Sequence, residues 1–173
     1  MIEVSIVGVR IEMPSNQPLV LLREVQGERH IPIWIGASEA TAIAMAEQGV
    51  VPPRPLTHDL LCAVIRALGH TLARVNLTKV DDGVFYAELV FDNGTTVSSR
   101  ASDAIAVAQR AGCALWAADA LMDEAGVVIN SEALNGDDDD PASLPAASDD
   151  AKEREVRQFR EFLNDVEPED FEK

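Results

Sequence analysis

Apolar and polar positions alternate along residues 2–13, which is typical of a β-strand with one face towards a core. The alternation slips at Gly8: the apolar residues up to Ile6 share one face, and those from Val7 to Met13 lie on the other. A β-bulge at a glycine produces such a slip, because the extra residue turns the strand over. The chain is therefore expected to begin with a long, bulged strand.

Shorter runs with strand or helix periodicity follow, and glycine, proline or turn sequences separate them. Strands are expected at 19–25, 30–35, 74–80, 84–92, 95–99, 113–116 and 127–129, and helices at 39–48, 58–68, 103–110 and 118–124. Ser38, Thr57 and Ser102 are the residues expected to cap the first three helices. Hairpins outnumber βαβ crossovers, so the pattern predicts an α+β fold: a mostly antiparallel or mixed sheet with packed helices.

The composition changes after the last expected strand. Residues 133–150 include four consecutive aspartates, two prolines and small polar residues, which is typical of an acidic flexible linker. Residues 151–173 are expected to form a C-terminal amphipathic helix and tail, because residues such as Phe159 and Leu163 make an apolar stripe at helical spacing. Residues 1–132 are then expected to fold as a single compact domain, with the acidic C-terminal tail outside its core.

The acidic balance of the chain changes which partners are expected. The net charge is −16, and residues 137–173 hold 14 of the 30 acidic residues but only 5 of the 14 basic ones. Such a chain repels phosphate backbones at long range, so nucleic-acid binding requires a local basic patch or a bound metal ion. The sequence has no long apolar stretch and no secretory signal, which predicts a cytoplasmic protein without a membrane span.

Three segments carry polar side chains that core packing does not require, and the first is residues 53–59. Arg54 can bind a phosphate, His58 can act as a general base or metal ligand, and Asp59 can ligate a metal. The same residues also suit an ordinary helix start, because an acid in the first turn favours the helix dipole and a histidine can simply lie at the surface. Spacing alone leaves both interpretations open.

The second segment, residues 98–103, ends an expected strand and begins a helix. Helix capping is enough to explain Ser102 and Asp103. Arg100 is less easily explained by local structure, because an arginine beside a helix N-terminus can form an anion site. It can also pair simply with Asp103, so this segment too has two interpretations.

The third segment, residues 34–39, leads from a strand into a helix. Glu39 could bind a divalent cation together with Asp59 or Asp103, because hard cations prefer carboxylate oxygens. It is also an ordinary acidic residue of a first helical turn, where a negative charge favours the helix dipole.

These segments belong to longer runs that resemble the bifunctional nuclease domain family. The runs are IPIWIGASEATAIA (31–44), PPRPLTHDLL (52–61), LGHTLARVNLTKVDDGVFYAEL (68–89) and RASDAIAVAQR (100–110), in the order that the family shows. The resemblance covers about residues 1–130, and the tail FREFLNDVEPEDF is similar to tails of some members. It implies a compact α/β domain that self-associates and acts on both DNA and RNA.

The resemblance also points to individual residues. Carried onto this sequence, it highlights Glu39, Arg54, His58, Asp59, Arg100, Ser102 and Asp103. Two positions depart from the family pattern: Ser98 stands where many members carry an acidic residue, and Ala101 stands where proline is frequent. The missing carboxylate at Ser98 removes one possible metal ligand.

The leading hypothesis is a nuclease that hydrolyses phosphodiester bonds of single-stranded or flexible DNA and RNA, assisted by Mg²⁺ or Mn²⁺. The assigned roles are catalytic for His58, Asp59 and Asp103, phosphate-binding for Arg54, Arg100 and Ser102, and metal-ligating for Glu39, Asp59 and Asp103. This hypothesis requires the three segments to converge in the fold.

The alternative hypothesis is a non-enzymatic, self-associating binding or regulatory module whose acidic tail docks on a partner. It is favoured by the net charge and the scarcity of aromatic residues that could stack on bases. A third possibility is a small anionic metabolite bound at the helix N-termini near Arg54 and Arg100. A homo-oligomer is expected in each case, because small residues flank the expected helices and the tail carries an apolar stripe.

Overall fold

The structure is a computed structural model, and it describes residues 1–129. The strands of this part are β1 (Ile2–Glu12), β2 (Gln17–Glu24), β3 (Arg29–Trp34), β4 (Leu72–Asp81), β5 (Val84–Phe91), β6 (Thr96–Arg100), β7 (Ala114–Ala117) and β8 (Val127–Val128). The helices are α1 (Ala37–Glu47), α2 (Thr57–Ala67), α3 (Ala101–Ala111) and α4 (Asp119–Ala125). Every strand and helix expected in this part is present, and each end lies within two residues of its expected place.

All eight strands join one sheet in the order β6-β5-β4-β7-β1-β2-β3-β8. The β4–β7 pair is parallel, and the other pairs within the described part of the chain are antiparallel. The sheet is therefore mixed and the fold is α+β, as predicted. The β1 bulge is confirmed as well: Ile6 lies opposite Leu22 and Gly8 opposite Leu21, so one extra residue sits between them.

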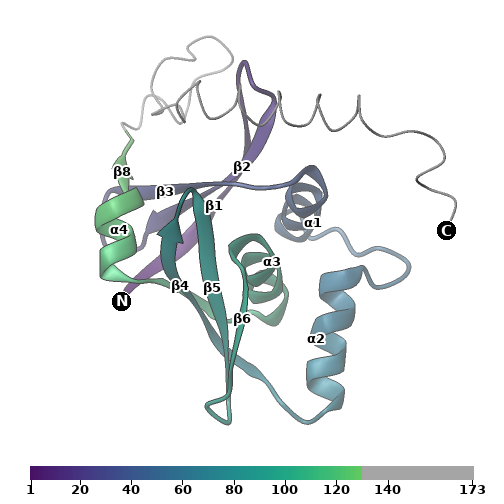
Figure 1. Cartoon of the computed structure of the whole chain (residues 1–173). Helices are drawn as coiled ribbons and strands as arrows, with labels where there is room; N and C mark the ends of the chain where they lie inside the picture. Colours follow the sequence, from purple (N-terminus) through teal and green to yellow (C-terminus); the bar gives the residue numbers. More distant parts are fainter. Residues whose placement is uncertain (130–173) are drawn as a thin grey trace, which may run out of the picture. The chain divides into compact units, whose positions relative to one another are not determined.

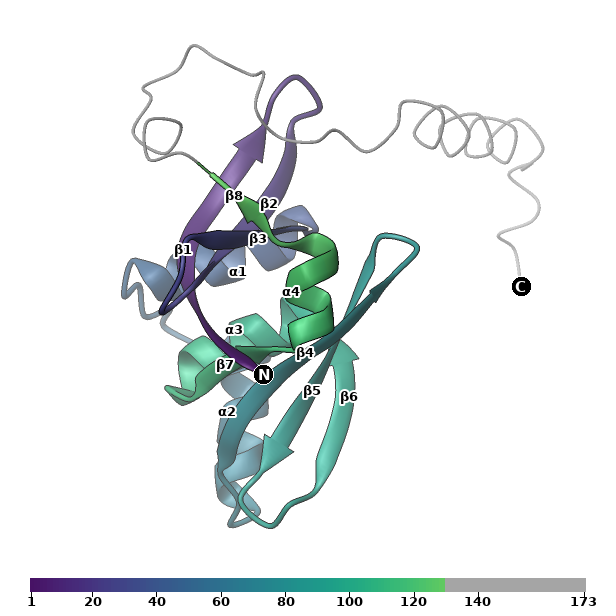
Figure 2. The same ribbon diagram turned by 90° about the vertical axis from the view of Figure 1, so that its left-hand side faces the viewer.

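The helices cover both faces of the sheet. Figures 1 and 2 show α1, α2 and α3 on one side and α4 on the other. On the side of the three helices, α3 packs directly on the sheet and also contacts both α1 and α2. Its alanine-rich sequence suits this central position, because small side chains let a helix approach neighbours on several sides, and seven of its residues are buried.

The three predicted helix caps are wrong by one or two residues. The cap positions, in extended conformation, are Gly36, Leu56 and Arg100. The helices α1 and α3 therefore begin one residue before the expected cap, and α2 begins at it. Thr57 and Ser102 lie inside their helices. The Ser38 hydroxyl donates to the Glu39 carboxylate and does not accept a hydrogen bond from a backbone N–H as a cap would.

The expected acidic linker at 133–150 and the C-terminal segment at 151–173 lie outside the described residues, as do the last positions of the domain expected at 1–132. Within the described part, no helix is both long and apolar enough to cross a membrane.

Candidate active site

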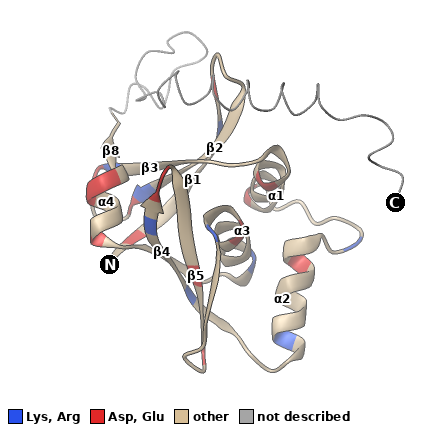
Figure 3. Ribbon diagram, viewed as in Figure 1, with Lys and Arg blue, Asp and Glu red and all other residues tan. Residues whose placement is uncertain are grey.

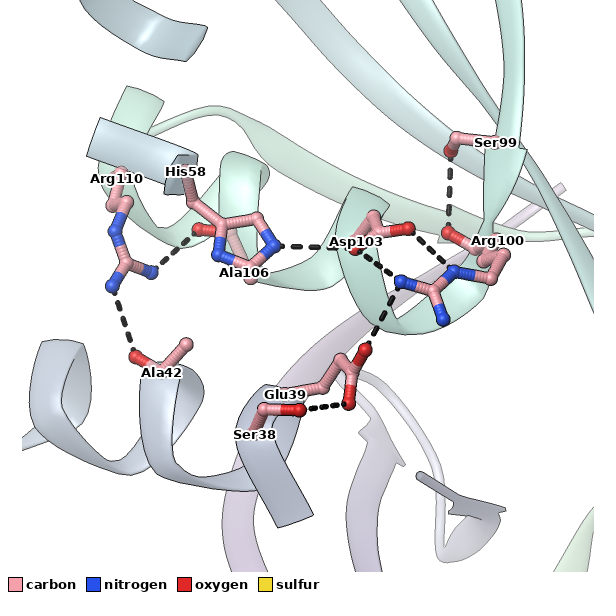
Figure 4. Close-up of polar contacts among 9 residues, drawn as sticks. All are labelled: Ser38, Glu39, Ala42, His58, Ser99, Arg100, Asp103, Ala106 and Arg110. Carbon is pink, nitrogen blue, oxygen red and sulfur yellow. Dashed lines mark hydrogen bonds and ion pairs between the residues drawn. The ribbon is translucent and has the colours of Figure 1, made fainter. Parts of the chain in front are cut away.

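The first turns of three helices meet at one place, and each contributes a polar side chain (Figure 4). Glu39 comes from α1, His58 from α2 and Asp103 from α3. Helix N-termini carry partial positive charge and unpaired backbone N–H groups, so their convergence favours negatively charged groups at this place. The required convergence of the three sequence segments is therefore present.

Arg100 joins these side chains. Its Nε lies 2.7 Å from Asp103 Oδ2, and its Nη2 lies 3.0 Å from both Asp103 Oδ1 and Glu39 Oε1. The guanidinium is held in one orientation because carboxylates from two different helices bond to it. The Arg100 side chain is still 67% exposed, so the guanidinium remains accessible to a ligand.

His58 completes the cluster from the opposite side of Asp103. Its Nε2 lies 3.2 Å from Asp103 Oδ1, and its side chain is only 13% exposed. A carboxylate only accepts hydrogen bonds, so the neutral imidazole donates its Nε2 proton here and its Nδ1 carries the lone pair. The arrangement fixes the tautomer of a potential general base and supplies a partner for its protonated form.

Asp59 forms no hydrogen bond with this cluster in the described structure. Its carboxylate accepts hydrogen bonds from the backbone N–H of Leu56 and from Nε of Arg110. The Arg110 side chain is 9% exposed, and it also donates to the carbonyls of Ala42 and Ala106, each at 3.0 Å. One arginine of α3 therefore ties α1 and α2 to α3, next to the residue pair His58 and Asp103.

The other two residues considered for phosphate binding form no hydrogen bond with the His58–Asp103 pair in the described structure. Arg54 is exposed in the loop before α2, and within the described residues it makes no hydrogen bond or ion pair. Ser102 is buried in the first turn of α3. Neither side chain bonds to the cluster, and their roles stay predictions.

A model of the bifunctional nuclease domain matches residues 20–130, and this range contains every residue of the cluster. The chain belongs to the bifunctional nuclease domain family. Two proteins of Mycobacterium tuberculosis, from strain CDC 1551 / Oshkosh and strain ATCC 25618 / H37Rv, are each 47% identical over 169 residues. The match covers 98% of this chain and 97% of theirs, and both are described as uncharacterized.

The carboxylates considered as metal ligands in this family member are already bonded to arginines. Glu39 and Asp103 share Arg100, and Asp59 binds Arg110. Within residues 1–129, no three His, Cys, Asp or Glu side chains gather into a group that could hold a metal ion. A divalent cation between Glu39 and Asp103 would have to displace the Arg100 guanidinium, so these contacts do not fit a preformed metal site.

Sequence reasoning missed Arg110, which it treated only as the end of a helix. The available signal was its distance of seven residues from Asp103, since two helical turns place both residues on the same face of α3. The signal was too weak to act on, because only the packing of α2 against α3 shows that Asp59 meets this arginine.

Hydrogen bonds favour the ionised forms of the cluster's acids. Partial burial of Asp103 opposes ionisation, but hydrogen bonds from Arg100 and His58 outweigh it and lower the pKa of the carboxyl below its ordinary 3.8. The Glu39 backbone N–H lowers the pKa of that carboxyl below 4.5, assisted by Ser38 and Arg100 against the effect of burial. Both acids are therefore charged at neutral pH and hold Arg100 in place.

Acid should lower the free energy of unfolding through the carboxyl groups of Asp103 and Glu39. Because the folded pKa values are lowered, the unfolded chain binds more protons near pH 4, and stability rises with pH there. The stabilisation is complete above the ordinary pKa values of 3.8 and 4.5 and is lost as the pH falls through the lowered ones. The measurement is denaturant unfolding of the wild type and Asp103→Asn between about pH 3 and pH 7. The free energy of unfolding should rise less steeply with pH in the variant than in the wild type. Identical slopes would contradict this assignment.

Proposed function

We propose that this protein hydrolyses phosphodiester bonds of DNA and RNA, with His58, Asp103 and Arg100 as the groups that act on the phosphate. The observation that carries the proposal is the 3.2 Å contact of His58 with Asp103 beside an exposed guanidinium. A base with a carboxylate partner can activate water for attack on phosphorus. A fixed cation and three helix N-termini stabilise the negative charge of the phosphate during that attack. Membership of the bifunctional nuclease domain family supports the same reaction class.

In this proposal His58 moves the proton. Its Nδ1 accepts a proton from a water molecule as the water oxygen bonds to phosphorus. The Nε2–H group keeps its hydrogen bond to Asp103 during this step. The bond from phosphorus to the leaving sugar oxygen breaks, and this oxygen takes up a proton from His58 or from solvent. The Asp103 carboxylate stabilises the imidazolium that forms between these two steps.

Arg100 is proposed to bind the non-bridging phosphate oxygens. The hydrogen bonds that it donates to Asp103, and then the Asp103 charge, raise the pKa of Arg100, so it stays protonated. Because Glu39 and Asp103 hold it from one side, binding a phosphate requires little loss of side-chain freedom.

The exposure of the two groups favours a flexible substrate. Arg100 lies at the surface, whereas His58 is recessed beside α3. A single-stranded or otherwise flexible strand can bend to bring one phosphate to both Arg100 and His58. Bending a stiff duplex over a short site costs roughly 1–6 kcal/mol. The net charge of −16 predicts weak binding, and the contact of Arg100 with the phosphate should weaken further as salt rises.

Metal assistance is a second, separate proposal, which requires the metal to displace the Arg100 guanidinium from Glu39 and Asp103. Mg²⁺ or Mn²⁺ would polarise the phosphate, and the candidate ligands are Glu39 and Asp103, with Asp59 further from the cluster. Arg100 already supplies a positive charge to both carboxylates, so the cluster does not need a metal to balance them. We therefore expect cleavage by the His58–Asp103 pair to persist in a chelator. Complete loss of cleavage in chelator and its return with Mn²⁺ would contradict that expectation and assign the carboxylates to a metal.

The experiment that tests the proposed function is cleavage of labelled single-stranded RNA and DNA by the purified full chain at low salt. His58→Gln removes the titratable base and keeps an amide that can bond Asp103. Equal cleavage by the wild type and His58→Gln would point to a contaminating nuclease or to another site. No cleavage by either, with both folded, would favour the binding or regulatory module.

A further inference from the structure

Among the aromatic residues of the described part of the chain, Tyr86 is the exposed one. It is 38% exposed, whereas Trp34, Phe85, Phe91 and Trp116 are partly buried. Proteins that bind single-stranded nucleic acid stack its bases on aromatic side chains, which have to be accessible. Tyr86 is therefore the side chain of the described residues that can take a base.

Tyr86 lies beside Arg100 in the sheet. In the β5–β6 pair Tyr86 is directly opposite Arg100, and the next residue of β5, Ala87, is opposite Ser99. Side chains of directly opposite residues leave the same face of a sheet, and their Cβ atoms lie about 4.5–5.5 Å apart. Ala87 is buried on the other face. The exposed ring is therefore an immediate neighbour of the arginine that is proposed to bind the phosphate.

Lys79 holds the ring from the other side. In the β4–β5 pair Lys79 is opposite Tyr86, and its Nζ lies 4.5 Å from the centre of the ring, where a cation is attracted to the ring face. The same Nζ donates to Asp81 Oδ2 at 2.8 Å. Figure 3 shows the basic positions of β4 in blue beside β5. Because β4 and β6 flank β5 on opposite sides, Lys79 covers the ring face towards β4, and the face towards Arg100 is the one available to a base.

A single-stranded nucleotide fits these two neighbours. Its base can stack on the open face of the Tyr86 ring while the adjacent phosphate binds the Arg100 guanidinium, which is 67% exposed. A base in a duplex is stacked on both of its faces, so it reaches the ring only after it has been unstacked and unpaired, which costs free energy. The pair Tyr86 and Arg100 therefore favours a single strand over a duplex.

The surrounding charges limit the contact to about one nucleotide. Glu88 follows Tyr86 by two residues on β5, and Asp81 is opposite Val84, which precedes Tyr86 by two. Residues spaced by two share a face of the sheet, so both carboxylates lie on the face of the ring and repel the further phosphates of a bound strand. Stacking on the ring and binding of the phosphate do not involve the 2′-hydroxyl, so DNA and RNA strands are expected to bind alike.

We propose that Tyr86 stacks on the base next to the phosphate that Arg100 binds, and that this contact selects single-stranded over double-stranded nucleic acid. The inference rests on the proposed function for the role of Arg100, and it adds a base-binding residue to that site. Its test measures binding, so that it can be separated from the test of cleavage.

The test is fluorescence anisotropy of labelled oligothymidylate at low salt, with the full chain carrying His58→Gln so that the strand stays intact. Adding Tyr86→Val keeps a residue that favours strands but removes the ring, and it should weaken binding by on the order of tenfold. Adding Tyr86→Phe keeps the ring and should leave the affinity unchanged, because the Tyr86 hydroxyl makes no hydrogen bond within residues 1–129. An abasic strand of the same length, which keeps the phosphates, should bind equally to the His58→Gln chain with and without Tyr86→Val.

Three results would overturn the inference: unchanged affinity after Tyr86→Val, an equal loss on the abasic strand, or equal affinity for a duplex and a single strand. Absence of oligothymidylate binding by the His58→Gln chain would overturn it as well. If Tyr86→Val loses affinity for oligothymidylate alone while the wild type cleaves nothing, base stacking is supported and the proposed hydrolysis fails. Circular dichroism checks the folding of each variant, and Tyr86→Leu is the second ring-free variant if Tyr86→Val does not fold.

Discussion

Replacing Asp103 by asparagine should lower the rate of phosphodiester cleavage by on the order of 10³-fold while the chain stays folded. Asparagine keeps the volume of the side chain, but it can present an N–H to His58 where the carboxylate can only accept. The His58 tautomer is then no longer fixed with its proton on Nε2, the imidazolium loses its charged partner, and Arg100 loses one of its two carboxylates. The measurement is the initial rate on single-stranded RNA, with thermal unfolding as the test of folding.

The chain contains a matched control for this variant. His70 Nδ1 lies 3.2 Å from Asp92 Oδ1, the same distance as in the His58–Asp103 contact. Both members of the control pair are more exposed, and in the described part of the chain no arginine bonds to them. Asp92→Asn should therefore leave the cleavage rate unchanged. A loss of similar size in both variants would show that the rate does not depend on the His58–Asp103 contact.

Replacing Arg110 by methionine should destabilise the domain by about 3 kcal/mol, which is the range for removing one partner of a buried ion pair. Methionine preserves much of the apolar volume but leaves the Asp59 carboxylate and the Ala42 carbonyl without their shared donor. For a domain of this size the melting temperature should fall by roughly 10 °C. The measurement is denaturant unfolding followed by circular dichroism.

Arg66→Met is the control, because Arg66 is an exposed arginine of α2 whose Nε bonds the Cys62 carbonyl 3.1 Å away. Its loss should cost under about 1 kcal/mol. Equal destabilisation in both variants would mean that Arg110 does not act as a clamp between helices. At temperatures where Arg110→Met is still folded, its cleavage rate should also fall, since α2 carries His58 and is anchored to α3 by this arginine.

These two predictions separate two roles that the sequence could not distinguish. Asp59 and Asp103 are both acidic residues in the first turn of a helix, and both were considered as metal ligands and catalytic residues. In the structure Asp103 binds His58 and Arg100 at the exposed cluster, whereas Asp59 binds a buried arginine. Asp103 is thus the candidate for chemistry in the proposed function, and we propose that Asp59 positions the helix that carries His58.

The order of strands and helices was predictable because each depends on short-range patterns. The period-two alternation of residues 2–13 with its slip at Gly8 corresponds directly to the bulge in β1. The helix starts were less predictable, because a hydroxyl near a helix end is only a statistical capping signal. Ser102 shows this: the extended residue that precedes α3 is Arg100, and Ser102 is buried in the first turn.

The sequence by itself determined the element order, the α+β class, the family resemblance and the three polar segments, since each depends on neighbouring residues or on long collinear motifs. Only the tertiary structure decided that Glu39 reaches Arg100, that His58 reaches Asp103 and that Asp59 bonds Arg110. It also decided that α2 leaves an apolar stripe of Leu60, Val64 and Leu68 uncovered. The physical reason is that these contacts join residues 45 to 68 positions apart, or depend on which side of α2 faces α3. Local propensity determines that a helix forms, whereas its orientation depends on the packing of the whole sheet and its helices.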